Sequence, residues 1–114
     1  MPEKILVIDD EPLILVAVER ALSRVGYTVT PVDNVKDLDS ALSNAPFDLL
    51  ITDINLGEES VDSIVQKVKE SSPAIRVIYM SGIVNEGRCK DFIEKPFKID
   101  DLRKKVRDML HGPS

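Results

Sequence analysis

The chain has 114 residues, 43% of them hydrophobic, and a formal net charge of −5. This composition predicts one folded domain over residues 1–114 rather than a disordered segment. The negative charge argues against direct binding to nucleic acid or to an anionic membrane, because both need a basic surface. The single cysteine excludes an intrachain disulfide. With no signal-peptide pattern and no apolar run near the ~20 residues that span a bilayer, we expect a soluble, cytoplasmic protein without membrane insertion.

Five short apolar segments alternate with segments of helical periodicity. Strands are expected at residues 4–8, 27–32, 48–52, 74–80 and 91–94. Helices are expected from Pro12 to Gly26, from Asp33 or Asn34 to Pro46, from Ser60 to Ser71, and from Asp100 or Asp101 to Gly112. This alternation with short connections implies a parallel sheet with helices on both faces.

The first helix carries apolar residues on several sides. Leu13, Ala17, Ala21 and Val25 recur at helical spacing. The stripe is widened by Leu15, Val16, Val18 and Leu22. We expect this stripe to face the core.

Distinctive polar residues follow the expected strands. The first strand ends in Asp9 and Asp10, the third in Asp53 and the fourth in Ser81, and Lys95 follows the fifth. In an open α/β sheet, ligands bind beyond the carboxyl ends of the strands. If the strands are parallel, all of these side chains lie along one edge.

Three carboxylates in close proximity repel one another unless a cation compensates them. Mg²⁺ suits such a set, because it takes a few carboxylates, a carbonyl and several waters. Asp10 and Asp53 are the expected direct ligands, with Asp9 acting directly or through water and the backbone carbonyl of Asn55 completing the set. Each aspartate taken alone is equally compatible with a helix cap or a surface charge. Their combination favours a metal site.

At this point the motifs match a known family. The chain resembles the receiver domain of two-component response regulators through ILVIDDEP (5–12), LLITDINL (49–56), VIYMSG (77–82) and FIEKPF (92–97). Each motif alone is unspecific, but four in this order span essentially the whole chain. The resemblance implies a doubly wound five-stranded parallel sheet of the flavodoxin-like type, with strand order 2-1-3-4-5. It also implies a single receiver domain without an output domain over these residues.

The resemblance further implies a phosphorylation switch. Asp53 matches the phosphoacceptor, which takes a phosphoryl group from a sensor histidine kinase or a phosphotransfer protein with the help of Mg²⁺. Lys95 matches the lysine that pairs with a phosphoryl oxygen. Ser81 and Phe92 match the hydroxyl and the aromatic residue that move on activation, and the bond before Pro96 matches one that is cis in the family. The downstream protein target remains open.

The chain departs from the family between its fourth and fifth strands. The segment from Gly82 to Lys90 has room for about one helical turn, so we expect the family's fourth helix to be absent or vestigial. This departure keeps a second function open, a receiver-like interaction domain that is not phosphorylated. A small phosphohydrolase is a third possibility, but the chain lacks an evident second acid or base for it. We therefore expect no enzymatic activity beyond the protein's own phosphorylation and dephosphorylation.

Overall fold

A five-stranded parallel sheet forms the centre of the computed structural model, which describes residues 3–54, 60–82 and 92–112. The strands are β1 (Lys4–Ile8), β2 (Thr28–Val32), β3 (Leu49–Asp53), β4 (Arg76–Ser81) and β5 (Phe92–Glu94). They lie in the order β2-β1-β3-β4-β5. The predicted flavodoxin-like topology is confirmed.

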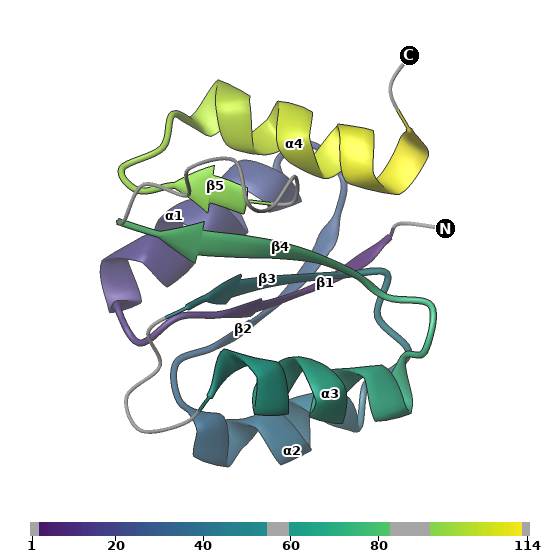
Figure 1. The fold of residues 1–114 in the computed structure, drawn as a ribbon. Coiled ribbons are helices and arrows are strands. Elements are labelled where there is room, and N and C mark those ends of the chain that lie inside the picture. The colour runs from purple at the N-terminus through teal and green to yellow at the C-terminus, as the bar shows by residue number, and fades with distance from the viewer. Residues whose placement is uncertain (1–2, 55–59, 83–91, 113–114) are drawn as a thin grey trace.

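Helices cover both faces of the sheet (Figure 1). One face carries α1 (Pro12–Ser23) and α4 (Ile99–His111), and the other carries α2 (Leu38–Leu42) and α3 (Val61–Ser71). Side chains of a strand point alternately to its two faces. In β1, accordingly, Ile5 and Val7 pack in the α1–α4 core, while Leu6 and Ile8 pack in the α2–α3 core.

Side-chain caps mark the beginning of two helical segments. Ser60 caps α3 by accepting a hydrogen bond from the backbone N–H of Asp62 at 3.2 Å, as its position predicted. Asn34 accepts from the N–H of Asp37 at 2.9 Å, but it caps a short 3₁₀ helix (Val35–Asp37) that leads into α2. The second helical segment is therefore shorter and less regular than predicted.

The predicted apolar stripe of α1 was too broad, because only part of it faces the core. The buried residues are Leu15, Val18, Ala21 and Leu22, whereas the side chain of Leu13 is 84% exposed and that of Val25 is 49% exposed. Each helical residue turns by about 100°, so Leu13 lies about 200° around the helix from Leu15. Residues 13–18 are all apolar, and periodicity alone did not show which of them face the sheet.

Two alanine substitutions on α1 test this orientation. Leu22 is fully buried, and Leu22→Ala should lower the free energy of unfolding by about 2–5 kcal/mol, because it leaves a cavity in the core. Leu13→Ala is the matched control and should change the free energy by less than about 0.5 kcal/mol. Urea denaturation of both variants measures the difference. A larger loss for Leu13→Ala would contradict the observed orientation.

The expected loss of a helix between β4 and β5 concerns residues 82–90, which beyond Gly82 lie outside the described residues. In the part of the chain that the structure describes, no helix combines the length and apolar character needed to cross a membrane.

Candidate functional site

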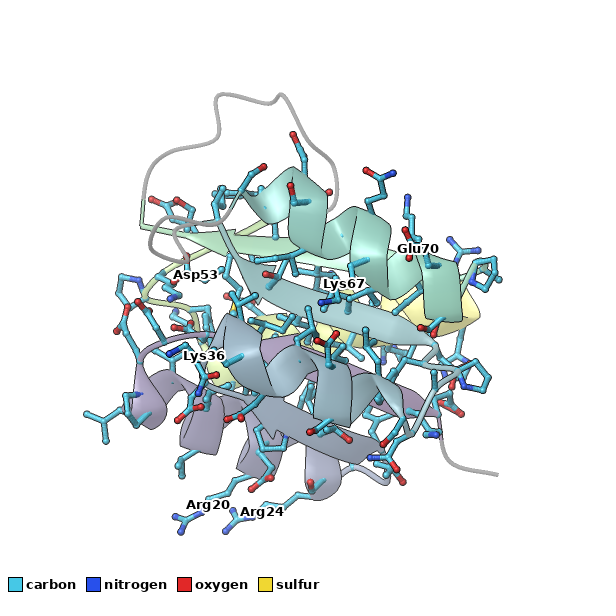
Figure 2. The ribbon with its side chains drawn as sticks, turned by 90° about the horizontal axis from the view of Figure 1, so that it is seen from below. Arg20, Arg24, Lys36, Asp53, Lys67 and Glu70 are labelled. Carbon is cyan, nitrogen blue, oxygen red and sulfur yellow. The ribbon has the colours of Figure 1, made fainter. Side chains whose placement is uncertain are left out.

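The register of the parallel strands brings several of the predicted site residues to one edge of the sheet. Ile8 pairs with Thr52, so Asp9 and Asp53 follow as neighbours at the ends of β1 and β3. Ser81 pairs with Glu94 across β4 and β5, and the next N–H, that of Lys95, donates to the carbonyl of Ser81 at 2.8 Å. Figure 2 shows Asp53 at this edge, at the end of its strand.

The ammonium group of Lys95 contacts three acidic side chains. Its Nζ lies 2.6 Å from Asp9 Oδ2, 3.0 Å from Asp53 Oδ2 and 3.4 Å from Glu11 Oε1. The side chain of Lys95 is only 12% exposed. One ammonium group therefore contacts two buried carboxylates and a third that is exposed, and its single positive charge offsets only part of their negative charge.

Burial and charge act in opposite directions on the pKa values of this group. Burial raises the pKa of Asp9, and the hydrogen bonds from Lys95 and from the backbone N–H of Glu11, at 2.9 Å, offset part of that rise. Burial alone would lower the pKa of Lys95, but its hydrogen bonds to Asp9 and Asp53 and their charges outweigh burial and raise it. Lys95 therefore carries its positive charge at neutral pH in this site.

The acidic side chains form a compact oxygen cluster. One carboxylate oxygen each from Asp9, Asp10, Glu11 and Asp53 can be chosen so that all lie within 4.8 Å of one another. Asp9 and Asp53 are buried, whereas Asp10 and Glu11 are exposed and border an open cleft of about 570 Å³ together with Lys95. Hard oxygen donors beside a solvent-open cleft suit Mg²⁺, which keeps several of its waters when bound. The donor set therefore fits the ion that the sequence predicted.

Of the other predicted site residues, those that the structure describes do not belong to the oxygen cluster, and each has a different place in the structure. Ser81 is the last residue of β4 and is buried, and its backbone carbonyl is tied to Lys95. Phe92 is the first residue of β5, is half-buried and pairs with Tyr79. Asn55 lies outside the described residues. The peptide bond between Lys95 and Pro96 is cis, as the resemblance to the receiver domain family implied.

Glu11 was not among the predicted site residues. It is the residue before α1 and its carboxylate both contacts Lys95 and belongs to the oxygen cluster. The available signal was its position in the acidic run Asp9-Asp10-Glu11, directly after a buried strand.

Comparison with known proteins agrees with this geometry. The family model described as "Response regulator receiver domain" matches residues 5–107. A curated relative is the TorCAD operon transcriptional regulatory protein TorR of Escherichia coli O157:H7, 28% identical over 96% of this chain and 51% of its own length. This chain thus spans about half the length of that relative.

Solved structures show the same fold. A response regulator from Thermotoga maritima superposes with a TM-score of 0.83 at 25% identity, covering 96% of this chain and 98% of that one. The chemotaxis response regulator CheY4 of Vibrio cholerae superposes with a TM-score of 0.84 at 20% identity, covering 96% of this chain and all of the other. Because the family model covers nearly the whole chain, this protein belongs to the response regulator receiver domain family.

Proposed function

We propose that this protein is a phosphorylation switch in which Asp53 accepts a phosphoryl group. The observation that carries the proposal is the arrangement of Asp53 beside Lys95, at 3.0 Å, and within the cluster of oxygen ligands. Phosphoryl transfer depends mainly on positioning and on neutralising the charge of the transferred group. This cluster offers a nucleophile, a fixed cation and a place for Mg²⁺ in one cleft.

In the proposed reaction, a carboxylate oxygen of Asp53 attacks the phosphorus atom of a phosphohistidine on a sensor kinase or a phosphotransfer protein. The new O–P bond forms as the P–N bond breaks, and the imidazole nitrogen keeps the electron pair and takes up a proton. Asp9, Asp10 and Asp53, with the backbone carbonyl of Asn55, would hold Mg²⁺. The bound ion supplies positive charge that neutralises the phosphoryl oxygens.

Lys95 would form an ion pair with a phosphoryl oxygen once Asp53 becomes an acyl phosphate. Its ammonium already contacts the attacking carboxylate, and Asp9 holds it there at 2.6 Å. Water then attacks the phosphorus atom and returns Asp53 and inorganic phosphate. The protein would thus act on its own aspartyl phosphate rather than on an external substrate.

The switch itself would be a shift between two conformations. A phosphoryl group moves the balance only if it binds one conformation better than the other. The hydroxyl of Ser81 and the ring of Phe92 are the proposed moving parts. They lie on the neighbouring strands β4 and β5, and Ser81 is linked by its carbonyl to the backbone of Lys95. The altered surface would then bind or release a downstream protein.

Acetyl phosphate tests the proposed acceptor chemistry without a partner kinase. With millimolar Mg²⁺, the intact mass of the protein should increase by one phosphoryl group, and EDTA should prevent the increase. The adduct should be lost in alkaline hydroxylamine, which cleaves acyl phosphates. No adduct with Mg²⁺ present would contradict the proposal and favour an interaction domain that is not phosphorylated.

A further inference from the structure

The helices α1 and α4 share one face of the sheet (Figure 1). A basic groove lies between them. Arg103 on α4 links the helices, because its Nε donates to the backbone carbonyl of Ala21 on α1 at 2.9 Å. On either side of Arg103 the surface is hollowed, with volumes of about 250 Å³ and 330 Å³. We call these two adjoining hollows the α1–α4 groove.

Most of the charged residues that line the groove are cationic. Its charged residues are Arg20, Arg24, Asp100, Arg103, Lys104 and Arg107, five of which are positive and one negative. The chain as a whole carries a formal net charge of −5, so positive charge is concentrated here. A local excess of one sign over a hollowed surface attracts a partner of the opposite sign.

These cations are poorly neutralised by the protein itself. Within the described residues, none of the side chains of Arg20, Arg24 and Arg103 forms an ion pair. Arg107 approaches only Asp108 there, at 3.9 Å, and both of those side chains are exposed. Figure 2 shows Arg20 and Arg24 extending side by side away from the body of the protein. Their guanidinium groups are available to an incoming anion.

Helix stability accounts for part of this arrangement. Arg20 and Arg24 lie at the C-terminal end of α1, where a positive charge is favourable, and Arg103 bonds to one of the last carbonyls of that helix. This role does not require Lys104, which lies in the middle of α4. It also does not explain why exposed apolar residues line the same groove, with Ile99 37% exposed and Val25 49% exposed.

We propose that the α1–α4 groove is a docking site for an acidic amphipathic segment of a partner protein. Arginine guanidinium groups bind carboxylates through paired hydrogen bonds, and the exposed Ile99 and Val25 offer apolar contact to the same segment. The two hollows lie at or below the lower end of the ~300–1,000 Å³ of typical small-molecule pockets and join into one open groove, which favours an extended protein segment over an enclosed ligand. The proposal does not depend on phosphorylation of Asp53.

A designed peptide tests the groove directly. The probe is a fluorescein-labelled synthetic helix with glutamates along one face and leucines along the other, and its binding is followed by fluorescence anisotropy. Arg20→Ser combined with Arg24→Ser should weaken binding about tenfold, because two charge pairs are lost. Arg103 is left unchanged because it bonds to Ala21, and circular dichroism verifies that the variant is folded. High salt should weaken binding to the wild-type protein.

The matched control combines Lys36→Ser with Lys67→Ser, which removes the same charge from the opposite helical layer (Figure 2). This control should retain the wild-type affinity within about twofold. An equal loss in both double variants would show nonspecific attraction and overturn the proposal. It would also be overturned if the peptide failed to bind the wild-type protein. Tighter binding of tripolyphosphate at the same arginines would assign the groove to a small phosphorylated ligand instead.

Discussion

Replacing Asp53 with asparagine is expected to abolish the phosphate adduct formed with acetyl phosphate. The amide oxygen is a much poorer nucleophile than a carboxylate, and the acyl phosphate of Asp53 cannot form. Asparagine nearly preserves the shape of the side chain and can still accept a hydrogen bond from Lys95, which lies 3.0 Å from Asp53 in the wild-type protein. The loss should therefore come from chemistry and not from unfolding. Intact-mass spectrometry after a fixed exposure with Mg²⁺ measures it.

Asp39→Asn is the matched control for this experiment. Asp39 lies on α2, and its side chain is 72% exposed and paired only with Lys67 in the described part of the chain. This variant should form the adduct to the wild-type extent. An undiminished adduct on Asp53→Asn would place the acceptor on another residue. Loss of the adduct on Asp39→Asn as well would show that the assay reports general damage to the protein.

The parallel α/β architecture could be predicted because short apolar strands alternate with segments of helical periodicity, whereas the strand order 2-1-3-4-5 came from the resemblance to the receiver domain family. The same regularity predicted the edge of the sheet at which Asp9, Asp53 and Lys95 meet, since the carboxyl ends of parallel strands lie together. No knowledge of side-chain conformation was needed for that step. Adjacency at the sheet edge followed from topology alone.

Features that depend on packing were not predictable in the same way. The apolar run at the start of α1 allowed several orientations, and only contact with the sheet selected Leu15 and Val18 over Leu13. The contact of Glu11 with Lys95 depends on the direction that the start of α1 gives to the Glu11 side chain. The position of Glu11 in the sequence does not show that direction. The unneutralised arginines of the α1–α4 groove come from two helices far apart in sequence, which the sequence alone did not bring together.

Replacing Lys95 with methionine should destabilise the protein when no divalent ion is present. The substitution keeps much of the apolar stem but removes the cation between Asp9, which is fully buried, and Asp53, which is 5% exposed. Removing one partner of a buried ion pair costs about 3–5 kcal/mol, because the remaining charges stay buried without compensation. The site borders an open cleft, so we expect a loss near the lower end, about 3 kcal/mol, in urea denaturation with EDTA.

Lys67→Met provides a control with the same contact distance. The Nζ of Lys67 lies 2.6 Å from Asp39 Oδ1, just as that of Lys95 lies 2.6 Å from Asp9 Oδ2, but the pair with Asp39 is on the surface. Loss of an exposed pair costs only about 0.2–1 kcal/mol. The difference between the two variants therefore isolates the effect of burial. Equal losses would contradict the argument that Lys95 neutralises buried charge.

Magnesium should restore part of the stability lost in Lys95→Met. An ion that binds only the folded protein raises the free energy of unfolding, and the gain grows with the logarithm of the ratio of ion concentration to dissociation constant once that ratio exceeds one. Without the ammonium group of Lys95, the site repels a divalent cation less, and its carboxylates keep more of their negative charge uncompensated. Millimolar Mg²⁺ should therefore raise the free energy of unfolding more in the variant than in the wild type. Adding Asp10→Ala should remove this extra gain, because Asp10 is the exposed aspartate of the oxygen cluster. A gain that survives Asp10→Ala would mean that the ion binds elsewhere.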